Sequence, residues 1–300
     1  MKKGIFIMIG VVLMLGSTSC KKDGVYTPKK KINAIYLETK STSTVTATGV
    51  STIRTTDKHK SQEWYWDGKL LKEVRHFDVD GTTITATETY TYNGKQLIRI
   101  DRTAKAAADS YITFNYDGKW ITSSEYYYSG KLNKSTIYTH TDKKISSYEE
   151  TSYNYSLDSK TIAEIETSYA EMMQPIGIVA HEPHAINTAK GQGESKHTVE
   201  LTWTDNNITS ITTKSNGGSS TIAYTYDDKK NPYYCMYDEN PCEPGMASEN
   251  NMLTSTSSEG SENTYTYDGK YPVTRTMKYT ITQPALTTVS EMIYTFEYKK

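Results

Sequence analysis

The chain has 300 residues, and its 34 lysine and arginine residues are balanced by 35 aspartate and glutamate residues. The two signs are interspersed, which excludes the basic stripe that nucleic-acid-binding proteins present, so no nucleic-acid partner is expected. Tyrosine outnumbers phenylalanine by 26 to 4, which indicates aromatic side chains with one edge in contact with water.

The first twenty residues have the pattern of an export signal. Lys2 and Lys3 precede an apolar run at residues 4–16, which is shorter than the roughly 20 residues that a membrane-spanning helix needs. Small residues then lead into Cys20, as in bacterial lipoproteins, whose signal peptide is removed before a cysteine that becomes acylated. Cys20 is therefore predicted to carry a lipid. The alternative is an ordinary signal peptide with an incidental cysteine.

The predicted organisation has one folded domain. Residues 1–19 are expected to form the signal peptide and residues 20–31 a lipidated tether. Residues 32–300 then form a single β domain with an irregular insertion near residues 170–197. Contact with a membrane is expected through the N-terminal lipid alone.

The domain repeats one short pattern, in which two aromatic residues in alternate positions precede a turn and an aliphatic residue. Copies begin "WYWDGKLL" at Trp64, "YTYNGKQLI" at Tyr90, "FNYDGKWI" at Phe114 and "YTYDGKYPV" at Tyr265. Asp-Gly and Asn-Gly supply the positive φ angles of a tight hairpin turn, and alternating bulky residues flank them as in β-strands. Each copy is therefore predicted to be a β-hairpin.

The pairing within a hairpin follows from counting outwards from a two-residue Asp-Gly turn, which sets Trp66 opposite Lys69 and Trp64 opposite Leu71. Leu97 and Ile100 lie three residues apart and would fall on opposite faces, so either a bulge shifts the phase or both faces are partly buried. Residues two apart share a face. One packed face is thus expected to collect Trp64, Trp66, Tyr90, Tyr92, Phe114 and Tyr116.

The spacing of the repeats predicts how the strands are connected. The last aromatic or histidine before each turn is Trp66, Tyr92, Tyr116, Tyr128, His140 and Tyr155. Intervals of 12 residues fit one strand and one turn, and intervals near 24 fit two of each. The predicted fold is all-β, an antiparallel up-and-down meander of about 16–20 strands curled into a barrel-like sheet. It is expected to be soluble, because the strands lack the apolar outer band of a membrane barrel.

The lipoprotein start and the serial "Y-x-Y-D-G" turns carry a family resemblance. Together with "YTYDDKKNPYY" from Tyr224, "YTYDGKYPVTRT" from Tyr265 and the final "YTFEYKK", they resemble a Bacteroidetes lipoprotein family of unknown function with a porin-like β fold. The resemblance implies a porin-like strand arrangement and a location in the cell envelope, at the outer membrane. It implies no activity and no cofactor.

Few residues suggest chemistry. Cys235 and Cys242 lie in the turn-rich stretch "YYCMYDENPCEPG" and are either a local disulfide or two reduced thiols, since an exported chain permits both. Two thiols without nearby histidines are too few ligands for zinc. His181 and His184 form "HEPH", but Pro183 disfavours the helix that would bring them together. No metal or cofactor is expected.

Two functional hypotheses follow. The first is non-catalytic binding of a ligand or partner, either an envelope protein or a glycan that stacks on aromatics of the face away from the packed one, namely Tyr65, Trp120, Tyr127 and Tyr271. The alternative is a hydrolase acting on polysaccharide, which requires two carboxyl groups facing each other in a cleft. Its candidate carboxylates are Glu149, Glu150, Glu164 and Glu166.

Overall fold

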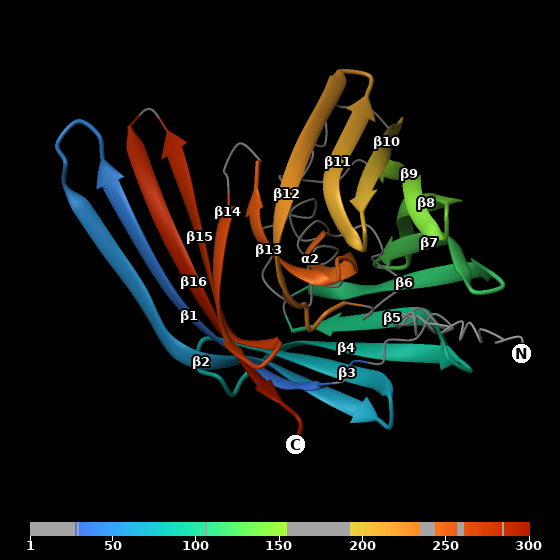
Figure 1. Ribbon diagram of the computed structural model, residues 1–300, viewed down its shortest axis with the longest axis horizontal. Helices are drawn as coiled ribbons and strands as arrows, with labels where there is room; N and C mark the ends of the chain where they lie inside the picture. Colours follow the sequence, from blue (N-terminus) through green and yellow to red (C-terminus); the bar gives the residue numbers. More distant parts are fainter. Residues whose placement is uncertain are drawn as a thin grey trace, which may run out of the picture.

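The computed structural model describes residues 28, 30–105, 107–154, 193–234, 244–256, 261–283 and 285–300. Sixteen strands in these residues close into one antiparallel barrel, in which each strand pairs with its neighbours in sequence and β1 pairs with β16 (Figure 1). The predicted up-and-down meander is therefore confirmed, and the sheet closes. The strands are β1 (Ile32–Val45), β2 (Ser51–Asp67), β3 (Leu70–Phe77), β4 (Ile84–Asn93), β5 (Gln96–Ala104), β6 (Ala107–Asp117), β7 (Trp120–Tyr128), β8 (Lys131–Thr141), β9 (Lys144–Asn154), β10 (Gly193–Thr204), β11 (Asn207–Ser215), β12 (Gly218–Lys230), β13 (Asn250–Ser255), β14 (Ser261–Asp268), β15 (Tyr271–Gln283) and β16 (Leu286–Tyr298).

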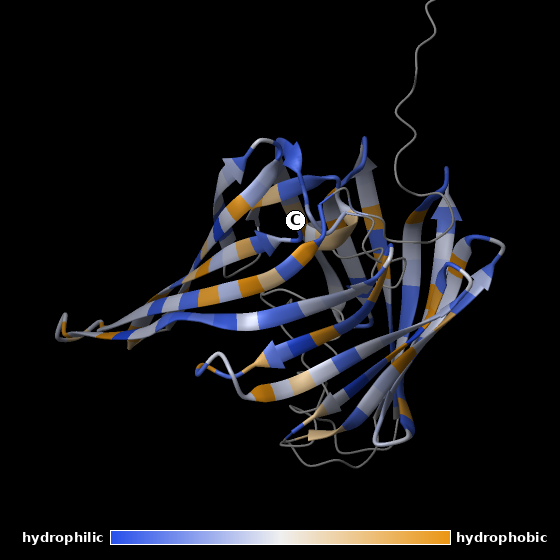
Figure 2. Ribbon diagram, turned by 90° about the horizontal axis from the view of Figure 1, so that it is seen from below, coloured by the Kyte–Doolittle hydropathy of each residue, from blue (hydrophilic) through white to orange (hydrophobic). Residues whose placement is uncertain are grey.

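The inner face of the barrel carries the hydrophobic core, and the repeated aromatics lie on it as predicted. Trp64, Tyr90 and Phe114 are buried, and Trp66, Tyr92 and Tyr116 pack against the buried cluster. Figure 2 shows the corresponding alternation of hydrophobic and hydrophilic residues along the strands. The alternation gives one face to the core and the other to solvent, as expected where successive side chains point to opposite faces.

The predicted pairing within the hairpins is wrong. Trp66 lies opposite Leu71 rather than Lys69, and Trp64 opposite Val74 rather than Leu71. The reason is that Asp67 stays in the strand, opposite Leu70, so that the loop consists of residues 68–69. Gly68, at φ 53°, supplies the left-handed conformation that such a loop requires.

A bulge after the tight turn of the repeat explains why Leu97 and Ile100 are both buried, so the first of the two alternatives, a shift of phase, is the correct one. Tyr92 pairs with Leu97 and Thr91 with Arg99, leaving Ile98 as the extra residue. The extra residue shifts the alternation by one position. The same shift occurs in the hairpins β2–β3, β6–β7, β8–β9, β10–β11 and β14–β15.

At five places in the described chain, the last aromatic of a motif donates through its polar atom to a backbone carbonyl of the preceding strand, which links neighbouring hairpins. Tyr116 Oη donates to the Leu97 carbonyl at 2.8 Å, and Trp203 Nε1 donates to the Ile145 carbonyl at 2.7 Å. Each such bond contributes about 0.5–1.5 kcal/mol net. The series explains why the motif uses tyrosine and tryptophan rather than phenylalanine, and it continues with Trp66 to Ile32, Tyr226 to Ile208 and Tyr298 to Pro272.

The described part of the connection between β12 and β13, residues 231–234 and 244–249, lies inside the barrel. It contains the short helix α2 (Pro244–Ala247), whose Met246 belongs to the core. The Tyr233 ring lies 6.5 Å from the Trp64 ring and 6.1 Å from the Phe296 ring, centroid to centroid. The connection thereby packs against β2 and β16, which lie far from β12 around the barrel (Figure 1).

The irregular insertion ends earlier than expected. Residues 193–197 belong to β10, where Glu194 pairs with Tyr153 and His197 with Glu150. The remainder of the predicted insertion lies outside the described residues. No helix in the described ranges has the length and apolar character needed to cross a membrane.

Candidate functional site

Two long hairpins, β1–β2 and β15–β16, extend beyond the strands beside them. β2 pairs with β3 only from Gln62 onwards, and β15 pairs with β14 only as far as Tyr279. Beyond these points the four strands continue together, as the upper left of Figure 1 shows. We call this part the four-stranded extension; it consists of residues 40–45, 51–56, 280–283 and 286–291.

The start of the described chain lies at the opposite rim, the one formed by the tight turns of the repeat. There Lys31 Nζ donates to the Gly68 carbonyl, and Lys30 forms an ion pair with Asp268 at 3.1 Å. The Lys299 amide donates to the Lys31 carbonyl at 2.7 Å, so both chain segments meet at this rim. The 14 residues of β1 then span roughly 45 Å to the far end of the extension.

The surface of the extension is rich in hydroxyl groups and has an apolar end. Ser43 and Thr288 share a hydrogen bond of 3.0 Å. Val45 is 40% exposed, and Val50 and Ile53 are each 61% exposed. Three of the six large exposed hydrophobic residues in the described ranges thus lie at this one hairpin end, which identifies it as the surface best suited to contact another molecule.

The four aromatics predicted to stack on a ligand are not brought together. Tyr65 lies on β2, Trp120 and Tyr127 lie on β7, and Tyr271 lies on β15. Four strands separate β2 from β7, which places them roughly 24 Å apart around the wall. The four residues therefore form no common platform.

Each of these rings already packs against a neighbouring side chain. The Arg75 guanidinium lies 4.4 Å from the centre of the Tyr65 ring, and Lys119 Nζ lies 4.8 Å from that of Trp120. The Tyr271 ring meets the Tyr298 ring edge to face at 6.1 Å. These contacts stabilise the individual rings and cover part of the surface that a sugar would need.

Tyr127 belongs to a row of stacked side chains that sequence reasoning did not find. Its ring stacks on Tyr111 at 4.6 Å between centroids, and the Arg99 guanidinium lies 3.8 Å from the centre of the Tyr111 ring. Tyr127 Oη donates to Glu125 at 2.8 Å, and this bond, with partial burial, raises the pKa of Tyr127 to about 12. Sequence reasoning missed this row because Tyr111 and Tyr127 are seen to lie opposite each other only when the register of the β6–β7 hairpin is known.

Ionisable groups on the inner face are matched with one another. Glu88 is fully buried, accepts a hydrogen bond from Tyr90 Oη at 2.6 Å and lies 3.0 Å from His76 Nε2. Arg102 lies opposite Glu88, and burial lowers the pKa of Arg102 against the attraction of that carboxylate. Such pairing is what a buried charge requires, so we assign these groups to the stability of the wall.

Glu149 and Glu150 cannot act together as an acid pair. They are successive residues of β9 and point to opposite faces. Glu149 is half exposed and paired with Lys196, whereas Glu150 is buried, with Lys134 Nζ at 3.4 Å and His197 Nε2 at 3.8 Å. The other expected candidates lie outside the described residues, namely Glu164, Glu166, His181, His184, Cys235, Cys242 and Cys20.

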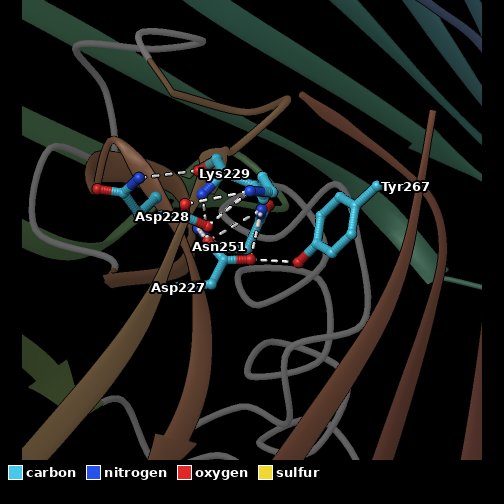
Figure 3. Close-up of polar contacts among 6 residues, drawn as sticks. Asp227, Asp228, Lys229, Asn251 and Tyr267 are labelled. Carbon is cyan, nitrogen blue, oxygen red and sulfur yellow. Dashed lines mark hydrogen bonds and ion pairs between the residues drawn. The ribbon is translucent and has the colours of Figure 1, made fainter. Parts of the chain in front are cut away.

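A polar network joins β12, β13 and β14 beside the internal connection (Figure 3). Asp227 accepts hydrogen bonds from the backbone amides of Lys229 at 2.9 Å and Asn251 at 3.1 Å, and from Tyr267 Oη. Burial, followed by the hydrogen bond to Asp227, raises the pKa of Tyr267. The carboxylate is saturated by these donors, so the network fixes the chain rather than offering a site for a ligand.

A small cavity lies next to this network, between the connection and strands β13–β16. Asn231, Tyr233, Met252, Arg275 and Phe296 contribute to its lining, and its free space is about 20 Å³. That is room for about one water molecule. Among the described residues, no group of three or more histidine, cysteine, aspartate or glutamate side chains could hold a metal ion.

No family model and no curated protein matches the chain. The solved structures that are similar to it include two porin-like proteins. One, from Bacteroides uniformis, has 10% sequence identity and a TM-score of 0.44, over 87% of this chain and 97% of that chain. The other, from Bacteroides vulgatus, has 10% identity and a TM-score of 0.42, over 90% of this chain and 99% of that chain. The closed barrel itself is established by the pairing of its strands.

Proposed function

We propose that the protein is a lipid-anchored, non-catalytic protein of the cell envelope that binds a ligand or partner through the four-stranded extension. The observation that supports this is the placement of the two ends of the barrel. The segment that follows the predicted lipidation site meets the rim of tight turns, at Lys31 and Gly68, and the extension leaves the other rim. A lipid on Cys20 would hold the first rim towards the membrane and direct the extension away from it.

The proposal includes membership of the Bacteroidetes lipoprotein family and a location at the outer membrane. Both are supported by the sequence pattern that ends at Cys20 and by the serial "Y-x-Y-D-G" turns. One acyl chain binds a membrane only marginally, so stable anchoring would use the several chains of a lipoprotein cysteine. The tether of residues 20–31 carries five lysines, which would add attraction to anionic head groups.

A glycan is a second ligand class, and it would bind on the wall of the barrel rather than on the four-stranded extension. Because the four predicted aromatics are spread over three strands, β2, β7 and β15, a glycan would bind at one of them rather than across all four. The Tyr111–Tyr127 pair offers two adjacent rings on this wall, stacked 4.6 Å apart between centroids. The hydrolase hypothesis gains nothing from the structure, since Glu149 and Glu150 face opposite sides of the sheet.

Anchoring is tested by membrane fractionation of cells that make the full chain. The wild-type protein should be found in the membrane fraction and take up a labelled fatty acid, whereas Cys20→Ala should lose the label and stay with uncleaved precursor. Wild-type protein without label would contradict the lipid anchor. A Cys235→Ser variant is the matched control, because that thiol lies outside the signal and should leave labelling unchanged.

Binding is tested with the mature chain carrying Cys20→Ala on an array of host and dietary glycans. Saturable binding that is lost in Tyr127→Ala or Trp120→Ala would assign a glycan to the outer face of β7. Tyr279→Phe, a change on β15, serves as the control. No binding to any glycan would remove this ligand class and leave protein partners.

A further inference from the structure

We propose that the free edge of β2 at residues 51–56 is a strand-addition site, at which an extended segment of a partner protein pairs antiparallel and places an acidic side chain beside Arg54. The inference deepens the proposed function, on which it rests, because it names the partner chemistry for the four-stranded extension. Backbone hydrogen bonds would supply the affinity, and alternate side chains would supply the specificity.

The edge is open over the end of β2 that lies in the extension. β3 pairs with β2 only between Gln62 and Asp67, and within the described ranges no strand pairs with residues 51–61 on that side. The turn between β3 and β4 shields the next part, because a Cβ on Gly81 would lie 3.2 Å from the Lys60 amide nitrogen. Residues 51–56 form the outermost strand edge in Figure 1, at its upper left.

The hydrogen-bonding groups of this edge point outwards at every second residue. The Val45 amide donates to the Val50 carbonyl at 2.9 Å, so the next pair, Thr44 with Ser51, does not exchange hydrogen bonds. The register is regular from there to the pairing of Thr39 with Thr56. By alternation, Ser51, Ile53 and Thr55 direct their N–H and C=O groups away from β1, which is the arrangement that an incoming strand requires.

This stretch lacks the devices by which proteins usually protect a free edge, such as bulges, prolines and lysines. A bulge begins only at residues 57–58, and Lys58 there folds over the Tyr36 ring, with Nζ 5.4 Å from its centre. Residues 51–56 contain no proline and a single charge, Arg54. Ile53, which precedes Arg54 in this stretch, is 61% exposed. An unprotected edge of this kind is expected where pairing is used.

Charge and shape indicate the chemistry of the incoming segment. Arg54 lies in a row with Ser41 and Ser290, and no acidic side chain contacts it among the described residues. An incoming carboxylate would form a charge-assisted hydrogen bond with its guanidinium. On the opposite face, Ile53 lies in a row with Thr42 and Val289, which suits a β-branched residue.

A second copy of the chain fits the edge less well than a different partner. Copies anchored by Cys20 in one membrane would all direct β2 the same way, whereas antiparallel pairing of β2 with itself requires opposite directions. Pairing of two such edges would also bring together only six residues from each copy, whereas a stable interface has about 20–30 residues per side. A partner protein can add contacts on the exposed apolar end at Val45 and Val50.

The test uses the mature chain carrying Cys20→Ala as bait for a phage-displayed library of random peptides, followed by titration of a synthetic copy of an enriched peptide. Enriched peptides should alternate acidic with β-branched residues. Ile53→Pro removes an outward N–H but no bond to β1, and should weaken binding about tenfold or more. Ile53→Val keeps that N–H and should bind nearly as the wild type does. The Arg54→Glu variant should no longer bind peptides with acidic side chains.

Amide hydrogen exchange identifies the bonds directly. Bound peptide should slow exchange at Ser51, Ile53 and Thr55 but not at Thr52 and Arg54, whose amides already bond to β1. The inference is overturned if no peptide is enriched, or if Ile53→Pro, folded by circular dichroism, binds like Ile53→Val. It is also overturned if light scattering shows a dimer that Ile53→Pro converts to monomer, because the occupant is then a second copy.

Failure of the proposed function and failure of the strand-addition site give different experimental results. Lipid labelling and glycan binding involve neither Ile53 nor Arg54, so their failure alongside Ile53-dependent peptide binding would refute the anchored receptor and leave the strand-addition site. Labelling with no peptide binding would refute the site and leave the anchored protein.

Discussion

The barrel body and the four-stranded extension are made of the same continuous strands, yet they differ in what their inner faces carry. Along the inner face of β16, Phe296 and Tyr294 are buried in the body, Met292 is partly buried, and Ser290 and Thr288 follow in the extension. β1 changes in the same direction, from Ile35 to Ser41 and Ser43. Where hydroxyl side chains replace aromatic ones on the inner face, the sheet can continue beyond the hydrophobic core with its backbone hydrogen bonds intact.

The largest expected effect lies in the body. Trp64→Ala removes a side chain that is 2% exposed and packs against Tyr233, and it should lower the free energy of unfolding by about 3–5 kcal/mol. Denaturant unfolding of the two proteins measures the difference. A cost no greater than that of a substitution in the extension would contradict the assignment of the inner face as the core.

An intermediate effect is expected for the bonds that link neighbouring hairpins. Tyr116→Phe leaves the Leu97 carbonyl without the hydroxyl that donates to it at 2.8 Å, and should cost about 1–2 kcal/mol. Tyr279→Phe is the matched control, because no described group bonds its hydroxyl. Equal unfolding midpoints for the two variants would show that the links do not contribute.

Acid should destabilise the connection between β12 and β13 through Glu249. The hydrogen bond from Lys230 lowers the pKa of Glu249 below 4.5, its ordinary value. A depressed pKa stabilises the fold above that value, and the contribution is lost as the pH falls through the folded-state pKa. The melting temperature should therefore decrease as the pH is lowered below about 4.5. The decrease should be less steep in the Glu249→Gln variant. Parallel curves for the two proteins would exclude this role.

The smallest effect is expected at the end of the extension. Val50→Ser changes a residue that is 61% exposed and should alter the free energy of unfolding by less than about 0.5 kcal/mol. The same denaturation experiment measures it. A loss comparable to that of Trp64→Ala would mean that the extension packs against the body rather than leaving it.

Hairpin turns, aromatic spacing and alternation were sufficient to predict the antiparallel meander and its packed face, because each is a local property of the sequence. The hairpin register was mispredicted at Trp66, since the choice between residues 67–68 and 68–69 as the loop depends on the bulge that follows. The four aromatics predicted to stack on a ligand lie on three strands that are distant around the barrel, namely Tyr65, Trp120, Tyr127 and Tyr271. Sequence alternation could not reveal this, because it carries no information on distance around a closed sheet. The free edge of β2 depends on where β3 begins to pair, which is a difference in strand length that no motif marks.

The bonds between successive hairpins bear on how such a barrel can change over evolution. In each of the five bonds described, the donor, such as Tyr116, lies later in the chain than the acceptor carbonyl, such as that of Leu97, so the bonds share one direction along the chain. Duplication or loss of one such hairpin would leave every remaining junction chemically intact. The circumference of such a barrel could therefore change in steps of two strands without loss of these bonds or of the turns that line the rim.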